Sequence, residues 1–82
     1  MKKNESKTLE EKMVEINFGK MIKRLREKFN YTQDCLADKT NLTNQTISNI
    51  ENHGQNVGIG TIMLFAKAFN MSISELLTYY EE

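Results

Sequence analysis

Apolar residues recur every three or four positions along most of the chain, which is the spacing expected of amphipathic helices. The first clear stripe lies within residues 17–29 and consists of Phe18, Ile22, Leu25 and Phe29. Basic side chains occupy the other side of this segment. The pattern predicts a helix that ends at Asn30, because asparagine tolerates the left-handed backbone conformation that closes many helices.

Two further helices are predicted from threonines placed where helices begin. Thr32 and Thr43 precede residues 33–39 and 44–51, and a threonine oxygen can accept a hydrogen bond from a free backbone N–H at a helix start. The inward apolar residues of these segments are Leu36, Ala37, Ile47 and Ile50. Each segment is therefore expected to form a short helix.

The last third of the chain predicts a loop and two more helices. Residues 52–58 are polar and contain two glycines, so a loop is expected there. The stripe of the helix predicted over residues 59–69 consists of Ile62, Phe65, Ala66 and Phe69. Residues 72–75, Ser-Ile-Ser-Glu, form a capping box that opens a last helix to about residue 80.

Residues 1–16 are polar and charged, and they predict an N-terminal arm ahead of a domain formed by residues 17–80. The arm is either frayed or partly helical. Residues 8–11, Thr-Leu-Glu-Glu, fit a capping box. The apolar residues at helical spacing after it are Leu9, Met13 and Ile16. Because the chain has no proline and no alternating strand pattern, the fold is predicted to be all-α with five helices.

The second and third predicted helices are joined by only three residues, Thr40, Asn41 and Leu42. A turn this short sets two helices at a large angle to one another. Asn41 can supply the positive φ that such a turn needs, and Ala37 is small where the helices cross. Residues 33–52 are therefore predicted to form a helix-turn-helix.

The outward face of the third predicted helix carries uncharged hydrogen-bonding side chains. With Ile47 placed inward, the outward residues are Asn44, Gln45, Thr46, Ser48, Asn49 and Asn52. Asparagine and threonine are mediocre helix formers, so helix stability alone does not explain this face. Asparagine and glutamine can pair with adenine in the major groove, and threonine can contact a thymine methyl group. The face is suited to reading base edges.

The net charge of the chain is compatible with DNA binding but does not favour it. The 82 residues carry 11 basic and 11 acidic side chains, whereas nucleic-acid-binding domains are commonly basic. Between residues 18 and 53, however, six basic side chains outnumber four acidic ones. The hydrophobic share of 39% is that of an ordinary globular domain.

Other functional classes find little support. No apolar run approaches the ~20 residues needed to span a bilayer, and no hydrophobic segment follows the basic start, so a cytoplasmic protein without a membrane partner is expected. The single cysteine, Cys35, is expected to be a bystander, and His53 has no companion at metal-ligand spacing. Methionines 13, 21, 63 and 71 are expected to pack inside. We therefore predict neither an enzyme nor a site for a cofactor, metal or small-molecule ligand.

Residues 18–77 resemble the Cro/CI-type helix-turn-helix family of phage repressors and bacterial regulators, which includes restriction-modification controller proteins. The matching motifs are Ile22-x-x-Leu25-Arg26, Tyr31-Thr32-Gln33-x-x-Leu36-Ala37, Thr43-x-x-Thr46-Ile47-Ser48-x-Ile50-Glu51-Asn52 and the segment from Ala66 to Leu77. The resemblance implies a five-helix, lambda-repressor-like DNA-binding domain. This sequence has Asn41 where the family usually has glycine, and Gly58 as a weak cap of the fourth helix.

The resemblance also implies roles for individual residues. The family reads bases at the positions of Asn44, Gln45 and Asn49, and Thr46 is expected to join them through a thymine contact. It contacts phosphate at the positions of Gln33, Thr43 and Asn52, and Ser48 is also expected to contact phosphate. Arg26 and Glu51 match an ion pair that ties the first helix to the third, the helix that reads DNA in this family, and we expect that pair to be structural.

Two functions are weighed on this basis. The first is a homodimeric repressor or autoregulating controller that binds double-stranded DNA at a palindromic operator, because two half-sites about 34 Å apart multiply specificity. Its expected dimer interface is formed by Ile73, Leu77, Tyr79 and Tyr80, and the segment with Leu9, Met13 and Ile16 is the second candidate. The alternative is an antitoxin or helical adaptor whose main partner is a protein, which the zero net charge favours.

Overall fold

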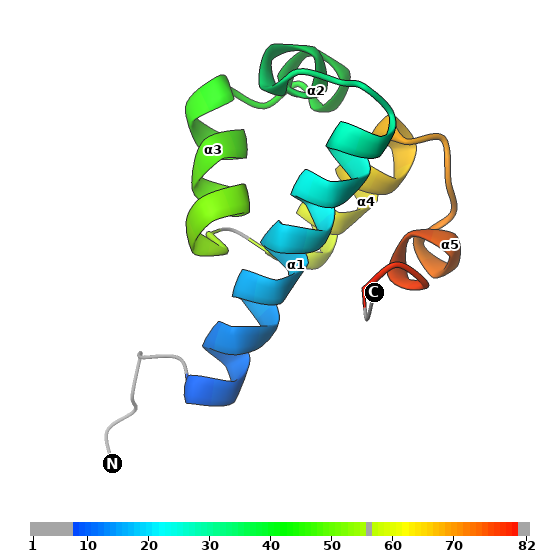
Figure 1. Ribbon diagram of the computed structural model, residues 1–82. Helices are drawn as coiled ribbons and strands as arrows, with labels where there is room; N and C mark the ends of the chain where they lie inside the picture. The colour runs from blue at the N-terminus through cyan, green and yellow to red at the C-terminus, as the bar shows by residue number, and fades with distance from the viewer. Residues whose placement is uncertain (1–7, 56, 81–82) are drawn as a thin grey trace.

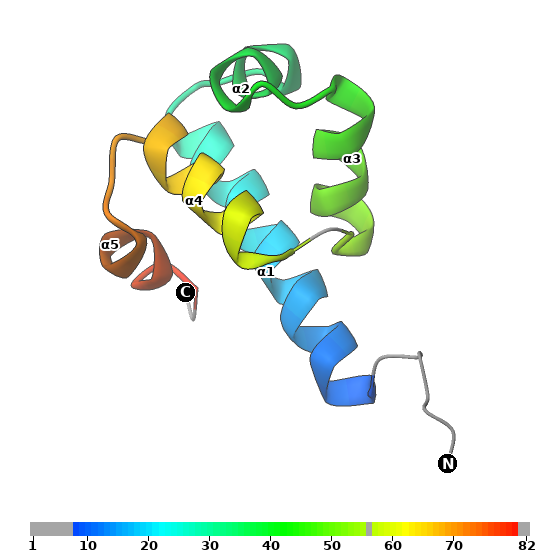
Figure 2. The same cartoon turned by 180° about the vertical axis from the view of Figure 1, so that it is seen from behind.

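The computed structural model describes residues 8–55 and 57–80, and within these ranges it contains five helices and no strand. The helices are α1 (Leu9–Lys28), α2 (Gln33–Thr40), α3 (Asn44–His53), α4 (Ile59–Ala68) and α5 (Ile73–Leu77). The predicted all-α fold is confirmed. Figure 1 shows α1 and α4 in the middle of the molecule, with α3 and α5 on opposite sides, and Figure 2 shows the same order from behind.

The core is built from the apolar stripes that the sequence predicted. Its buried hydrophobic residues come from all five helices and from the C-cap of α4: Phe18, Met21, Ile22, Leu25, Leu36, Ala37, Ile47, Ile50, Phe65, Ala66, Phe69 and Leu76. Helices of five to ten residues, such as α2 to α5, are marginal in isolation. Packing against the long α1 and against one another is therefore what holds them in place.

The first helix begins at Leu9, eight residues before the start that its apolar stripe predicted. Thr8 and Glu11 form the expected capping box, with the Glu11 N–H donating to Thr8 Oγ1 at 3.1 Å and the Thr8 N–H donating to Glu11 Oε1 at 3.0 Å. No left-handed residue follows until Asn30. The partly helical form of the arm is therefore the one found for residues 9–16, which are the beginning of α1 and not a separate element. Residues 1–7 of the predicted arm lie outside the described residues.

A left-handed residue stands at or just after the C-cap of the helices α1 to α4, but not of α5. Asn30 and Asn41 have φ angles of 60° and 61°, as predicted, and Asn70 has a φ of 60° that was not predicted. The prediction that α3 ends near Glu51 is wrong, because Gly54, with a φ of 71°, closes the helix after His53. Asn52 therefore belongs to α3 and not to the loop.

The last helix is shorter than predicted. It ends at Leu77, and residues 78–80 continue as a turn. Tyr79 and Tyr80 fold back in this turn and pack against the core.

Two of the four methionines that were predicted to pack inside do not do so. Met21 is fully buried and Met71 packs against the core, but Met13 and Met63 are 53% and 54% exposed. Met13 lies on the first turns of α1, which extend beyond the other helices (Figure 1). In the parts of the chain that the structure describes, no helix has the length and apolar character needed to cross a membrane.

Candidate nucleic-acid interface

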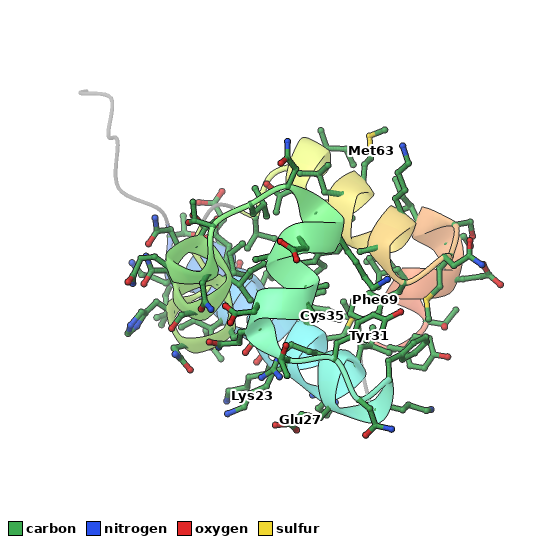
Figure 3. The ribbon with its side chains drawn as sticks, turned by 90° about the horizontal axis from the view of Figure 1, so that it is seen from above. Lys23, Glu27, Tyr31, Cys35, Met63 and Phe69 are labelled. Carbon is green, nitrogen blue, oxygen red and sulfur yellow. The ribbon has the colours of Figure 1, made fainter. Side chains whose placement is uncertain are left out.

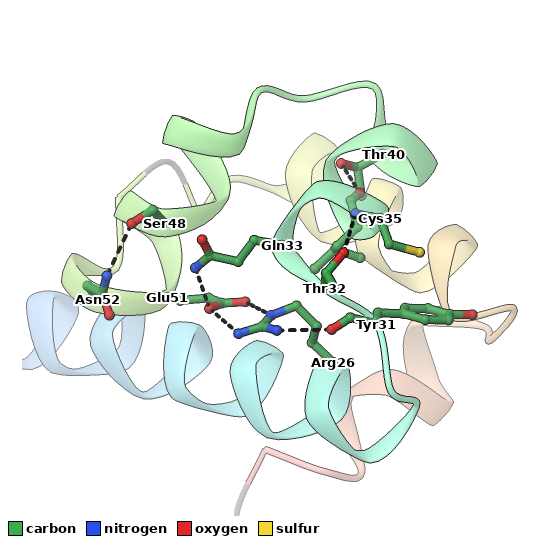
Figure 4. A network of polar contacts seen from close by, with 10 residues as sticks. Arg26, Tyr31, Thr32, Gln33, Cys35, Thr40, Ser48, Glu51 and Asn52 are labelled. Atoms are coloured by element: carbon green, nitrogen blue, oxygen red, sulfur yellow. Dashed lines mark hydrogen bonds and ion pairs between the residues drawn. The ribbon is translucent and has the colours of Figure 1, made fainter.

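The turn between α2 and α3 is held by backbone and side-chain hydrogen bonds. Asn41 adopts φ 61° and ψ 28°, and its N–H donates to the carbonyl groups of Ala37 and Asp38. The buried Thr40 hydroxyl donates to the Leu36 carbonyl oxygen at 2.8 Å (Figure 4). Thr43 then caps α3 by accepting the Thr46 N–H at 3.0 Å. The asparagine that replaces the family's usual glycine thus adopts the left-handed conformation that the turn requires.

The third helix rests on α1 at two glycines. A Cβ placed on Gly19 would lie 1.9 Å from the Ile50 carbonyl oxygen, and one placed on Gly54 would lie 2.6 Å from the Glu15 backbone. Neither glycine was assigned this role from the sequence. The available signal was Gly19 itself, because a glycine inside an amphipathic helix weakens it unless a close approach requires the missing side chain.

An ion pair joins α1 to α3. Arg26 Nε lies 2.7 Å from Glu51 Oε2, and Arg26 Nη2 lies 3.1 Å from Glu51 Oε1. The Glu51 side chain is 1% exposed and that of Arg26 is 12% exposed. The hydrogen bond with Glu51 raises the pKa of Arg26 and outweighs burial, which lowers it, so the guanidinium remains charged. A paired, bidentate geometry of this kind fixes both side chains.

The same carboxylate also holds the second helix. Gln33 Nε2 donates to Glu51 Oε1 at 3.1 Å, and Arg26 Nη1 donates to the Tyr31 carbonyl oxygen at 2.9 Å (Figure 4). One amide hydrogen of Gln33 is thus directed inward. Its predicted phosphate contact stays a prediction, to be made through the second amide hydrogen or the free backbone N–H at the start of α2.

The polar residues of α3 lie opposite its buried side. Ile47, Ile50 and Glu51 are buried, whereas the outward residues are exposed (Asn44, Gln45 and Asn52) or half-buried (Thr46, Ser48 and Asn49). The helical projection made from the sequence therefore places this face correctly. The assignment of these residues to base or phosphate contacts remains a prediction.

These polar side chains already form hydrogen bonds within the protein. Gln45 Nε2 donates to Asn49 Oδ1 at 3.1 Å, and Asn52 Nδ2 donates to Ser48 Oγ at 3.2 Å. Asn44 Nδ2 donates to a carboxylate oxygen of Asp34, a residue in the first turn of α2. Asp34 was not among the predicted site residues, because no spacing in the sequence indicates a contact across the turn.

The predicted dimer residues differ in exposure. Leu77 is 43% exposed, whereas Ile73, Tyr79 and Tyr80 are half-buried and pack against the protein's own core. Leu77 and Tyr80 line an apolar groove of about 560 Å³, together with Val14, Phe18, Val57 and Ile62. The Tyr80 hydroxyl lies 3.3 Å from the Val14 carbonyl oxygen, to which it donates. The groove thus brings the last helix next to the N-terminal half of α1.

Exposed apolar residues of α4 were missed. Ile59 and Met63 are 67% and 54% exposed, and Leu64 is also exposed. In Figure 3, Met63 points away from the body of the protein. Of these residues only Met63 was predicted to pack in the core, and Ile59 and Leu64 were given no role, because periodicity does not show which side of a helix faces solvent when both sides carry apolar residues.

Comparison with known proteins identifies the class. A helix-turn-helix family model matches residues 22–76, which is most of the chain. The protein therefore belongs to the Cro/CI-type helix-turn-helix family of DNA-binding transcriptional regulators, and the resemblance inferred from the sequence is confirmed.

Particular relatives lie within this class. The chain is 33% identical over 66 residues to the competence pilus inhibition repressor of Acinetobacter baylyi, covering 80% of this chain and 60% of that protein. It is 32% identical over 62 residues to the HTH-type transcriptional regulator ImmR of Bacillus subtilis, covering 76% of this chain and 49% of that protein. The chain thus spans about half to three-fifths of the length of these relatives.

A solved structure shares the fold. The crystal structure of the restriction-modification controller protein C.AhdI from Aeromonas hydrophila matches with a TM-score of 0.69 and 26% sequence identity. The match covers 76% of this chain and 94% of the controller. The lambda-repressor-like arrangement predicted for the five helices is thus supported by a protein of the same class.

Proposed function

We propose that this protein is a homodimeric, sequence-specific regulator that inserts α3 into the major groove of a palindromic DNA operator. It acts in the cytoplasm as a repressor or an autoregulating controller and needs no cofactor. The observation that carries the proposal is the outward face of α3, which is rich in uncharged amides and held in place by the turn at Asn41 and the pair of Arg26 and Glu51.

Base reading is assigned to the middle of that face. The proposed base-reading residues are Asn44, Gln45, Thr46 and Asn49. An amide offers one acceptor and a donor side by side, which matches the N6 and N7 edge of adenine. Because Gln45 and Asn49 already pair with one another, their side chains lose less freedom when they bind DNA.

Phosphate contacts are assigned to the ends of the motif. The proposed residues are Gln33, Thr43, Ser48 and Asn52. Such contacts orient a protein on the duplex but carry no sequence information. The division between base and phosphate contacts can be tested by substitution.

Replacing Gln45 or Asn49 with alanine is expected to weaken binding to the preferred site by about 1–3 kcal/mol, with the loss confined to one base position. The reason is that an alanine cannot make the paired hydrogen bonds that distinguish adenine. Selection of bound sequences from a random duplex library, performed on each variant and on the wild type, measures the change position by position.

Asn52→Ala is the matched control for this experiment. It truncates an exposed amide on the same helix, but at a proposed phosphate contact, so binding to all sequences should weaken by a similar factor. If Gln45→Ala and Asn49→Ala also weaken all sequences equally, these residues contact the backbone and the assignment is wrong.

Dimerisation is assigned to the surface around the groove. Leu77 is an exposed apolar residue of α5 that lines this groove. The second candidate segment, near Leu9 and Met13, is also exposed, and its neighbour Val14 lines the same groove as Leu77. The two candidate interfaces are therefore parts of neighbouring surface, which supports one dimer face.

Leu77→Asp is expected to produce a folded monomer. Leu77 is already partly covered, so burying the remainder contributes roughly 1 kcal/mol per subunit and roughly 2 kcal/mol per dimer. A dimer Kd about thirty-fold higher follows, and sedimentation velocity measures it.

Ser74→Asp is the control, because it adds the same charge to an exposed position of α5. A Leu77→Asp protein that sediments as a dimer at the wild-type Kd would exclude this surface from the interface.

A further inference from the structure

We propose that Asp34 is a positioning residue that sets the base preference of Asn44. This inference rests on the proposed function, in which Asn44 contacts bases. Asp34 lies in the first turn of α2 and Asn44 is the first residue of α3, so the contact bridges the two helices of the motif. Both side chains are exposed, and Asn44 Nδ2 donates to Asp34 Oδ1.

The contact allows only one orientation of the Asn44 amide. An ionised carboxylate has acceptors and no donor, so only the amide nitrogen of Asn44 can face Asp34. Rotating the amide by half a turn would place two oxygen acceptors against one another. The carbonyl oxygen of Asn44 is therefore held on the side away from Asp34, with one N–H left for another partner.

The other two amides of the proposed base-reading set lack this constraint. The amide nitrogen of Gln45 donates a hydrogen bond to the amide oxygen of Asn49. If both amides rotate, Asn49 becomes the donor and Gln45 the acceptor, so the hydrogen bond is preserved. The bond between Gln45 and Asn49 therefore does not fix which way their amides face, whereas Asn44 cannot rotate without losing its bond to Asp34.

A fixed amide distinguishes bases by their hydrogen-bonding groups. Adenine and cytosine present an amino group in the major groove, and the held oxygen of Asn44 can accept a hydrogen bond from it. Guanine presents O6 and N7, both acceptors, and its O6 would face another acceptor. Asn44 held by Asp34 should therefore favour adenine or cytosine and disfavour guanine at the position that it contacts.

The negative charge of Asp34 is a second reason to assign it a specific role, because this charge is unfavourable on a surface that binds DNA. A carboxylate on the surface that approaches DNA repels phosphate and lowers the affinity for every sequence. Its other contribution is to stabilise the start of α2 through the helix dipole. That contribution is structural, and it would appear in stability without changing which base is preferred.

The test compares four proteins in selections from random duplex DNA: the wild type, Asp34→Ala, Asn44→Ala and Asp38→Ala. Asp34→Ala should reduce the discrimination against guanine by about five-fold or more at one position. That position should be the one at which Asn44→Ala also loses its preference. Asp38→Ala removes the same charge from an exposed position on the same helix and should keep the wild-type motif.

The outcomes separate this inference from the proposed function. A wild-type motif that Asp34→Ala leaves unchanged would overturn the positioning role while leaving sequence-specific binding intact. An equal loss of affinity for all sequences, together with a lower melting temperature, would also overturn the positioning role, because this result is expected if Asp34 only stabilises α2. A wild-type protein that enriches no motif would remove the proposed function, and the role of Asp34 with it.

Discussion

Replacing Arg26 with alanine is expected to lower the free energy of unfolding by about 3–5 kcal/mol. The substitution leaves the carboxylate of Glu51, whose side chain is 1% exposed, without its cationic partner. Gln33 would remain as a neutral donor at 3.1 Å from Glu51 Oε1, which cannot balance a buried charge. A domain of this size has roughly 5–15 kcal/mol of stability in total, so a large part of it would be lost. Urea denaturation of wild type and variant measures the difference.

Two controls connect this loss to the buried charge. Arg24→Ala makes the same change two residues away, where the guanidinium is exposed and donates to the Tyr79 carbonyl oxygen at 3.1 Å, so a loss below about 1 kcal/mol is expected. Adding Glu51→Gln to Arg26→Ala should restore part of the stability, because no buried charge then remains. An Arg26→Ala protein within about 1 kcal/mol of the wild type would show that the pair contributes little.

Gly19→Ala is expected to lower the free energy of unfolding by about 2–3 kcal/mol net. The new methyl group would lie 1.9 Å from the Ile50 carbonyl oxygen, which is backbone and cannot move as a side chain does, so α1 and α3 must separate. Overpacking typically costs about 1–3 kcal/mol and occasionally more. A clash with backbone belongs at or above the top of this range, whereas alanine gains only about 1 kcal/mol in helix propensity. Thermal unfolding monitored by circular dichroism measures the balance.

Gly60→Ala is the matched control, because it makes the same substitution in α4, where the new Cβ would meet no other part of the described chain within 4 Å. Here only the helix propensity changes, and stability should rise by up to about 1 kcal/mol. If Gly19→Ala raises stability by a similar amount, the close contact between α1 and α3 is not present in solution.

Much of the fold could be predicted because local signals determine it. The threonines that cap α2 and α3 and the asparagines that end α1 and α2 act through their own backbone neighbours. The apolar stripes identify the buried sides because a helix repeats every 3.6 residues. The outward face of α3 followed from the same period, starting from Ile47.

What could not be predicted depends on contacts between segments distant in the sequence. Gly19 and Gly54 are required by the close approach of α3 to α1, which neither local sequence shows. Asp34 meets Asn44 only after the turn has set the two helices at an angle. The exposed apolar residues of α4, such as Met63, have the spacing of core residues, and only the positions of the neighbouring helices show that they face solvent.

The most direct test of a sequence-reading dimer is a selection by the wild-type protein from random duplex DNA at ~150 mM salt, where non-specific phosphate binding is suppressed. We predict an enriched palindrome whose half-sites lie about one helical turn, ~34 Å, apart. Enrichment of no sequence by folded protein would contradict the proposed function and favour a protein as the main partner.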